Sequence, residues 1–434
     1  MSRPVNVGLV GLGTIGTGVA RLFFEQSAGF AWRYNAPVVL RRIADKDLAT
    51  DRGVAIPEGV LTDDVMSVLA DPDIDIIIEL VGGIEPARRF ILAAIEHGKH
   101  VVTANKALLS AHGDEIFRAA ADRGVDVLFE ASVGGSIPIL RALRTSLQTS
   151  RIQSIFGIVN GTTNYILTRM AGEGASYADM LRSAQEHGFA ERDPSADVTG
   201  RDSLQKLVIM LRLGFSAVVR PADVLCEGIE GITPSDIAYA NELGYTVKLL
   251  AVAKRQGDRI EARVHPAMIP SDSVMAGVKY EYNAIEVVGE EFGTQVFYGK
   301  GAGQRPTATV VVSDVLDIAA RVRCGMSCSR VHELLDDGAS PALVPQDDLT
   351  VRHYVRLEVV DRAGVLSEIA RVFARENISI ESVIQKGRAT GETVPLVIMT
   401  HEAREAALRA AVDYLAKLAV VHAPVQRIRV EDLS

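Results

Sequence analysis

The stretch "GLVGLGTIGTGVA", residues 8–20, decides the fold expected for the first part of the chain. It sets Gly11, Gly13 and Gly16 in G-x-G-x-x-G register between an apolar strand and a helix. The first glycine permits a tight turn, the second lets backbone approach a pyrophosphate, and the third lets helix and strand pack closely. The alternative is a tight turn without a ligand. The candidate cofactor contacts in this loop are Gly11, Gly13, Thr14, Ile15 and Gly16.

The first 132 residues repeat an alternation of short apolar runs and helix-like stretches. Nearly continuous apolar strands separated by helices indicate a parallel sheet covered on both faces. We therefore predict an α/β domain of the Rossmann type, a doubly wound parallel sheet, over residues 1–132. The apolar runs are 5–12, 38–44, 73–80, 100–104 and 126–132, and the helix-like stretches include 85–97 and 113–123.

An acidic residue at the end of the second strand is expected to meet the ribose of a bound dinucleotide. The best candidate is Asp45, which comes late because the preceding connection is long. Its carboxylate would accept from a 2′-hydroxyl and repel a 2′-phosphate, whereas Arg41, Arg42 or Lys46 could receive that phosphate. NAD and NADP both remain open, and an equal alternative is that Asp45 caps the following turn.

Beyond the first domain the pattern changes twice. Residues 133–306 mix longer helices with later strands, which indicates an α+β domain for substrate binding, catalysis and dimerisation. A helical stretch at 307–325 is expected to pack back on the first domain, and 326–350 is predicted to be a linker. Residues 351–434 then show a strand–helix–strand–strand–helix–strand order, the ferredoxin-like arrangement of a separate domain.

Composition limits the function further. The chain has 434 residues, is 48% hydrophobic and carries a net charge of -9 without a basic stripe, which argues against nucleic-acid binding. Three cysteines cannot form a disulfide framework, so a reducing cytoplasm is expected. No apolar run reaches the ~18 residues that a membrane span needs. These features favour a cytoplasmic enzyme that acts on a small molecule.

A charged stretch, "AERDPSADVTGRDSLQKL" at 190–207, leads into an apolar helix. With a helix from about Val198 to Leu213, Asp202 and Lys206 lie at i and i+4 on one face. An ordinary surface ion pair is one reading. The apolar continuation favours the other, in which these charges form a cleft floor where carboxylates receive an ammonium group and the lysine handles a proton.

Several motifs in order resemble those of the homoserine dehydrogenase family. They span roughly residues 1–325, and Arg192 departs from the pattern because a proline is usual there. The resemblance implies NAD(P)-dependent interconversion of homoserine and aspartate semialdehyde, a reaction of threonine, methionine and isoleucine biosynthesis. The motifs are "VTANKALLS" (102–110), "FEASVGGSIPIL" (129–140), "VNGTTNYIL" (159–167), "GFAERDPSADVTGRDSLQK" (188–206) and "GKGAGQRPTA" (299–308).

The resemblance implies a role for each charged residue. Lys206 would be the general acid that protonates the semialdehyde carbonyl oxygen, and the base in the reverse direction. Asp202 would orient Lys206 and bind substrate, and Glu191 would take the substrate ammonium group. Lys106 would lie near both nicotinamide and substrate, although an exposed lysine at a helix start is the alternative.

Further positions carry binding roles by the same resemblance. Gly161, Thr162 and Thr163 would offer donors to the substrate carboxylate or the carboxamide, and the same residues would also suit a helix N-cap. A glycine-rich turn can aim several carbonyls at one point, and a structural monovalent cation (Na⁺) would lie there, held by Glu130, Val133, Gly135 and Ile137. The remaining candidates for the cofactor cleft are Thr103, Gly188 and Gly303.

The C-terminal unit resembles the ACT domain, a regulatory fold that commonly binds amino acids. The resemblance rests on Asp361, Gly364 and Leu366 in "DRAGVLSEIA". It implies an amino-acid effector, plausibly threonine, and a homodimer or larger homo-oligomer. Two rivals remain: another ACT-containing dehydrogenase such as prephenate dehydrogenase, and a non-catalytic sensor of nucleotides and amino acids.

Overall fold

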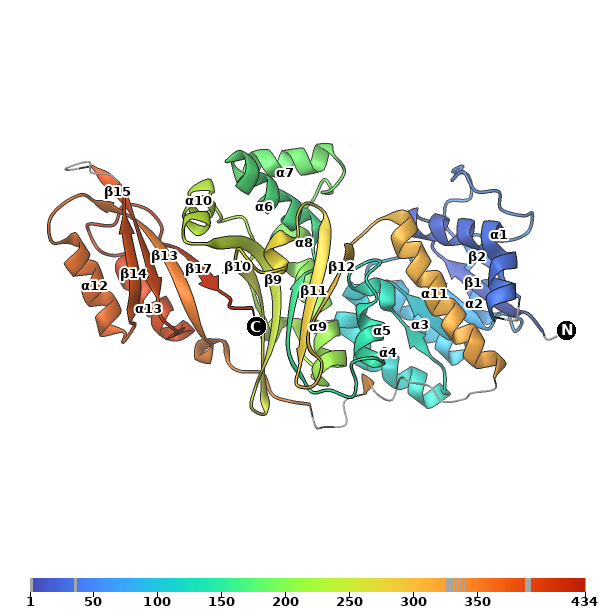
Figure 1. Cartoon of the computed structure of the whole chain (residues 1–434). Helices are drawn as coiled ribbons and strands as arrows, with labels where there is room; N and C mark the ends of the chain where they lie inside the picture. Colours follow the sequence, from blue (N-terminus) through green and yellow to red (C-terminus); the bar gives the residue numbers. More distant parts are fainter. Residues whose placement is uncertain are drawn as a thin grey trace.

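The computed structural model describes residues 3–34, 37–324, 331, 334–335, 338, 340–386 and 392–433. Part of the predicted linker, including 326–330, lies outside these residues. Three regions follow one another across the molecule, from the N-terminal sheet at one end to the C-terminal unit at the other (Figure 1). The middle region contains the longest strands and lies between the other two.

Among the described residues, six strands form the first sheet in the order β3-β2-β1-β4-β5-β6, and each pairing is parallel. The order reverses at β1, which places the glycine loop at the switch point where such sheets bind ligands. The predicted doubly wound sheet is confirmed, and β3 is an addition. The elements are β1 (Val5–Val10), α1 (Thr14–Tyr34), β2 (Val38–Ala44), β3 (Leu61–Thr62), α2 (Val65–Ala70), β4 (Ile76–Glu79), α3 (Ala87–Glu96), β5 (His100–Thr103), α4 (Lys106–Arg123) and β6 (Val127–Leu128).

Helix α11 (Gln304–Arg323) returns to this first sheet from far along the chain and lies beside α1 (Figure 1). Its apolar face, including Val311 and Val315, is buried in the same core as β1. The contact is close, because a Cβ added at Gly18 would lie 2.9 Å from the Ala308 Cβ. Residues 307–323 of the predicted helix thus belong to the core of the first region, and 325 lies outside the described residues.

The middle region combines antiparallel strands with helices, as predicted for an α+β unit. Its main strands pair in the order β12-β11-β7-β9-β10. The strands are β7 (Ile152–Ile158), β8 (Leu225–Cys226), β9 (Tyr245–Gln256), β10 (Arg259–Pro270), β11 (Tyr282–Gly289) and β12 (Gly293–Lys300). The helices are α5 (Ile139–Arg144), α6 (Gly161–Glu173), α7 (Tyr177–Glu186), α8 (Ser195–Val198), α9 (Arg201–Phe215) and α10 (Pro234–Glu242).

One helix differs from expectation. The continuous helix predicted from about Val198 to Leu213 is wrong, because Gly200 has φ +85° and separates α8 from α9. A Cβ at Gly200 would lie 3.1 Å from the Cys226 Sγ, so the chain turns there against β8. The break points the first turn of α9, with its charged residues, away from the direction of α8.

The C-terminal unit has the predicted ferredoxin-like order, with strands paired as β17-β13-β15-β14. One face of its sheet packs against α12 and α13 in a core of its own, which includes Leu357, Ile369 and Leu408. The fold prediction is therefore confirmed for this unit. Its elements are β13 (Thr350–Val360), α12 (Val365–Arg375), β14 (Ile380–Gln385), β15 (Thr393–Thr400), β16 (Ala403–Arg404), α13 (Glu405–Leu415) and β17 (Gln426–Val430).

The middle and C-terminal sheets are continuous. Strand β17 pairs in parallel with β10, with Ala267 opposite Arg429 and Met268 opposite Val430. Directly beyond β17, Glu431 accepts hydrogen bonds from the fully buried Arg263 at 2.7 and 2.9 Å. Backbone pairing and buried charge therefore both fix the C-terminal unit to the middle region.

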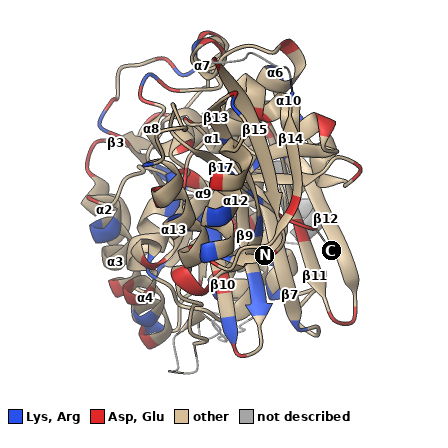
Figure 2. Cartoon of the chain, turned by 90° about the vertical axis from the view of Figure 1, so that its left-hand side faces the viewer, with Lys and Arg blue, Asp and Glu red and all other residues tan. Residues whose placement is uncertain are grey.

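Charged residues of both signs are interspersed over the helices and strands, as the view onto the C-terminal end shows (Figure 2). Across the described ranges, no helix is both long and apolar enough to cross a bilayer.

Candidate active site

The predicted pair at the start of α9 is buried. Lys206 is 9% exposed, and its Nζ donates to the Asp202 Oδ2 at 2.7 Å. The same Nζ donates to the backbone carbonyl of Val159, the residue after β7. The reading as an ordinary surface ion pair is therefore wrong, because both groups are buried on a helix whose apolar residues lie in the core.

Burial and charge shift the pKa of both groups. Burial lowers the pKa of the Lys206 ammonium, and the second lysine, Lys106, lowers it further while Asp202 opposes the change. Burial alone would raise the pKa of Asp202, but Lys206 and Lys106 outweigh it and hold that pKa at about 2. The site thus combines a permanently ionised carboxylate with a lysine that releases its proton more readily than usual.

Asn160 organises the carboxylates of this site. Its Nδ2 donates to the Asp197 Oδ1 at 2.7 Å and to the Asp202 Oδ2 at 2.9 Å, while its Oδ1 caps α6 through the Thr163 N–H. Burial, followed by the nearby Asp202 charge, raises the pKa of Asp197. Sequence reasoning did not select Asn160. Its place at the end of a strand and before a helix was the available signal.

Lys106 reaches the same carboxylate from the first region. It is the first residue of α4, and its Nζ lies 3.2 Å from the Asp202 Oδ1. Its side chain is 36% exposed, so this lysine faces the open side of the site. Asp202 therefore lies between two lysines, one on α4 of the first region and one on α9 of the middle region.

The predicted substrate contacts are arranged around this centre in two ways. Gly161, Thr162 and Thr163 form the first turn of α6, next to its cap Asn160. The Thr162 hydroxyl donates to the Phe189 carbonyl and the Thr163 hydroxyl to Asn160, so these hydroxyls already have protein acceptors. Glu191 is exposed on the turn before α8, where its backbone carbonyl accepts from Gln185.

The glycine loop borders two cavities of about 270 and 210 Å³. Gly11, Gly13 and Asp45 line the larger cavity, and Gly13, Thr14 and Ile15 line the smaller one. Any side chain at the third glycine would break the turn, since a Cβ at Gly16 would lie 2.1 Å from the Gly11 carbonyl oxygen. The loop therefore has the close backbone packing and the adjacent space that a dinucleotide requires.

Asp45 follows β2 and points at the glycine loop. Its carboxylate accepts from the Leu12 N–H and the Asp47 N–H, and lies 3.4 Å from Arg52. Arg52 also donates to the Leu12 carbonyl, which sequence reasoning did not anticipate. Asp45 therefore both shapes the loop and lines the cavity.

The end of β5 completes this cleft. Thr103 is fully buried, and its hydroxyl donates to the Glu79 carboxylate at 2.7 Å. Glu79 lines the smaller cavity together with Asn105. Of the other predicted cofactor contacts, Gly188 follows α7, and Gly303 precedes α11 with φ +127°. The next residue, Gln304, donates to the Thr14 carbonyl, so the start of α11 lies at the glycine loop.

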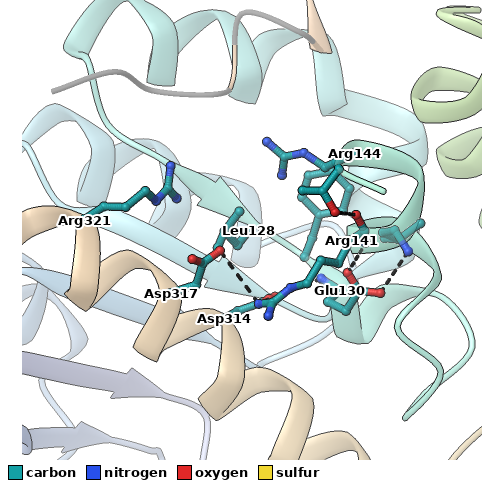
Figure 3. Close-up of a pocket in the computed structure, with 10 residues that line it drawn as sticks. Leu128, Glu130, Arg141, Arg144, Asp314, Asp317 and Arg321 are labelled. Carbon is teal, nitrogen blue, oxygen red and sulfur yellow. Dashed lines mark hydrogen bonds and ion pairs between the residues drawn. The ribbon is translucent and has the colours of Figure 1, made fainter. Parts of the chain in front are cut away.

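Glu130, predicted near a cation, borders a cavity of about 240 Å³ between α5 and α11 (Figure 3). Its carboxylate accepts the N–H groups of Leu140 and Arg141, and its own N–H donates to Asp314. Burial, reinforced by the Asp314 charge, raises the pKa of Glu130 to about 8, and burial raises that of Asp314 to about 7. No cluster of three His, Cys, Asp or Glu side chains suited to a metal ion occurs among the described residues.

The structure combines a Rossmann-type sheet, a glycine loop bordered by cavities, and a centre in which lysines meet a carboxylate. Together these features define a dehydrogenase that uses a nicotinamide dinucleotide. Comparison with protein families agrees. Residues 11–130 match the model of the homoserine dehydrogenase NAD binding domain, 138–316 that of homoserine dehydrogenase, and 353–419 that of the ACT domain.

Individual relatives match over the whole chain. Homoserine dehydrogenase of Synechocystis sp. is 42% identical over 98% of this chain and 99% of its own length, and that of Bacillus subtilis is 40% identical over 99% of both. The structure of a homoserine dehydrogenase from Thiobacillus denitrificans superposes with a TM-score of 0.92 at 39% identity, covering 99% of both chains. A hyperthermophilic archaeal homoserine dehydrogenase in complex with NADPH gives a TM-score of 0.62 at 25% identity, covering 73% of this chain and 98% of its own.

The chain belongs to the homoserine dehydrogenase family. It is an NAD(P)-dependent oxidoreductase of amino-acid biosynthesis that interconverts L-homoserine and L-aspartate 4-semialdehyde, and it carries a C-terminal ACT domain. The rival assignments to prephenate dehydrogenase and to a non-catalytic sensor are thereby set aside.

The buried acids Glu130 and Asp314 predict that stability falls as pH rises. Their folded pKa values of about 8 and 7 lie above the ordinary values of 4.5 and 3.8. Between the ordinary and the folded pKa the folded state binds more protons than the unfolded chain, so stability decreases as pH rises through that interval. We expect Glu130→Gln to make the decrease between pH 5 and 8 smaller, as measured by urea unfolding. Asp122→Asn, which changes an exposed acid of α4, is the control. An equal slope in parent and Glu130→Gln would contradict the prediction.

Proposed function

We propose that Lys206 is the general acid and base of the dehydrogenase reaction and that Asp202 orients it. The observation that carries this proposal is the buried 2.7 Å contact between the two side chains, at a site that Lys106 also reaches. The Val159 carbonyl fixes Nζ from a second side, so the remaining N–H has one direction left, toward the open part of the site. A lysine held in this way suits directed proton transfer.

The roles follow from the balance of the reaction. A bound nicotinamide cofactor would supply the hydride for the aldehyde carbon of aspartate semialdehyde and would accept it from homoserine in the reverse direction. Lys206 gives its proton to the carbonyl oxygen during reduction and removes the hydroxyl proton during oxidation. Its lowered pKa favours that second step because less free energy is needed to reach the neutral amine, and Lys106 would add positive charge beside the developing oxyanion.

The substrate's two charged ends require separate partners. Glu191 would receive the ammonium group, because its turn precedes α8 at the entrance to the carboxylate cluster. The first N–H groups of α6, at Gly161 and Thr162, would receive the carboxylate, since a helix N-terminus attracts anions. Gly161 suits this place because a Cβ there would lie 2.7 Å from the Glu281 carbonyl oxygen.

A structural monovalent cation, Na⁺, would be held by the backbone carbonyls of Glu130, Val133, Gly135 and Ile137. The turn that contains them is buried, and Gly134 and Gly135 have φ +68° and +58°, conformations that bend the chain tightly. Gly135 also packs against Gly301: a Cβ added at Gly135 would lie 2.4 Å from the Gly301 carbonyl oxygen. Such a curled, oxygen-rich turn fits a hard cation.

The ACT domain would bind an amino-acid effector, plausibly threonine, that inhibits the enzyme. Continuity of its sheet with the catalytic sheet supports such regulation, because movement of β17 must act on β10.

A cytoplasmic homodimer or larger homo-oligomer is the proposed assembly. Within the described residues β12 and β14 are the open edges of the long sheet, and open edges invite pairing between chains.

The cofactor would be NAD or NADP, with discrimination at Asp45. We expect Asp45→Asn to raise kcat/KM with NADP relative to NAD by roughly tenfold, because removing one negative charge near a 2′-phosphate changes binding by about 1.4 kcal/mol. Asparagine keeps an acceptor for the Leu12 N–H. Initial rates of homoserine oxidation with both cofactors measure the ratio. Asp47→Asn, half exposed nearby, is the control, and an unchanged ratio in Asp45→Asn would exclude this role.

Replacing Lys206 tests the central proposal. Lys206→Ala should lower kcat by about 10²–10⁴-fold, the usual contribution of a general acid or base, while the Kd for NADPH stays unchanged. Gln205→Ala, on the neighbouring position of α9, should retain activity. Steady-state rates and fluorescence titration with NADPH provide the two readouts. Turnover within tenfold of the parent would show that another group moves the proton.

A further inference from the structure

One loop contacts both the ACT domain and the start of α9, the helix that carries Asp202 and Lys206. It comprises residues 226–229, which begin with the last residue of β8, and Glu227 is its charged member. The Glu227 Oε2 accepts from the Arg429 Nη1 at 2.7 Å, and its Oε1 accepts from the Arg429 Nη2 at 3.0 Å and the Arg427 Nη2 at 2.9 Å. Both arginines belong to β17, the strand that joins the two sheets.

Arg429 is itself fixed from the ACT side. It is 3% exposed, and it also donates to the carboxylate of Glu405, the first residue of α13, at 3.0 and 3.1 Å. The pKa of Glu227 is lowered, since the two arginines outweigh the effect of burial. A bidentate arginine shared by two carboxylates gives a directional link between the ACT core and this loop.

The loop in turn fixes the junction of α8 and α9. The Ile229 N–H donates to the Val198 carbonyl at 2.9 Å, and the Cys226 thiol contacts the Thr199 carbonyl at 3.4 Å. Backbone approach is close as well, because a Cβ at Gly228 would lie 2.1 Å from the Val198 oxygen. A shift of the loop must therefore shift residues 198–200.

This junction separates the two carboxylates around Lys206. Asp197 precedes it in α8 and Asp202 follows it in α9, and Asn160 joins the two. We infer that Glu227 is a positioning residue for the dehydrogenase reaction: held by Arg427 and Arg429, it fixes the junction and thereby the position of Asp197 beside the Asp202–Lys206 pair of α9. The inference rests on the proposed roles of Asp202 and Lys206.

A purely structural role for Glu227 makes a different prediction. It would cost stability like any cross-domain ion pair, and the folded enzyme would keep its kinetic constants. Lys254 offers a matched comparison, because it pairs with Glu431 at 2.7 Å across the same interface, and its side chain is 30% exposed against 32% for Glu227. Lys254 does not belong to the 226–229 loop.

The experiment compares Glu227→Gln with Lys254→Gln in the full chain. We expect Glu227→Gln to lower kcat/KM for homoserine by about tenfold or more, since small displacements of catalytic groups have effects of this size. Its Kd for NADPH should stay unchanged, its pH–rate limb should shift, and Glu227→Asp should recover part of the activity. Lys254→Gln should keep its kinetic constants.

Kinetic constants within twofold of the parent in Glu227→Gln, or equal losses in Lys254→Gln, would overturn the inference. If Glu227→Gln does not fold, Arg427→Gln decides in the same way, because it removes one of the three hydrogen bonds to Glu227. Failure of the proposed function would look different: Lys206→Ala would then retain turnover, whatever Glu227→Gln shows.

Discussion

The structure depends on one costly arrangement, the burial of the Lys206 ammonium group. A buried charge is tolerated only when opposite charge and hydrogen bonds surround it. Asp202 and the Val159 carbonyl supply these, and Asn160 holds Asp202 from the other side. Behind the pair, the fully buried Leu207 and Leu211 fix α9 in the core. The same burial that lowers the stability of the fold also lowers the pKa of Lys206. The loss of stability and the readiness of the lysine to release its proton therefore have one cause.

The surrounding fold brings three separate regions to this pair. Lys106 reaches it from the first sheet, at the end of the strand that also positions Thr103 in the cofactor cleft. The middle region contributes α9, and β17 continues the sheet of that region into the ACT domain. Because Asp202 contacts lysines from two regions, relative movement of the regions changes its electrostatic environment. Regulation from the ACT domain is thus compatible with a site beside β7 of the catalytic sheet.

Most of the correct predictions came from local sequence patterns. The spacing of the glycines predicted the loop after the first strand, and the four-residue spacing of Asp202 and Lys206 predicted that they share one face of a helix. Contacts between distant segments could not be predicted in this way. Asn160 is joined to Asp202 only after β7 and α9 pack together, and the turn at Gly200 depends on β8. The pairing of β17 with β10 likewise has no local signal, since the two strands lie far apart in the sequence.

The most direct test of this account is the pH dependence of kcat/KM for homoserine oxidation in the parent enzyme and in Asp202→Asn. Lys206 must be neutral to accept the hydroxyl proton, so the rate should rise as pH passes the lysine pKa. Because the Asp202 carboxylate stabilises the ammonium form, its removal should lower that pKa and move the rising limb to lower pH. A limb that keeps its position, or moves to higher pH, would contradict the central role of the buried Lys206–Asp202 pair.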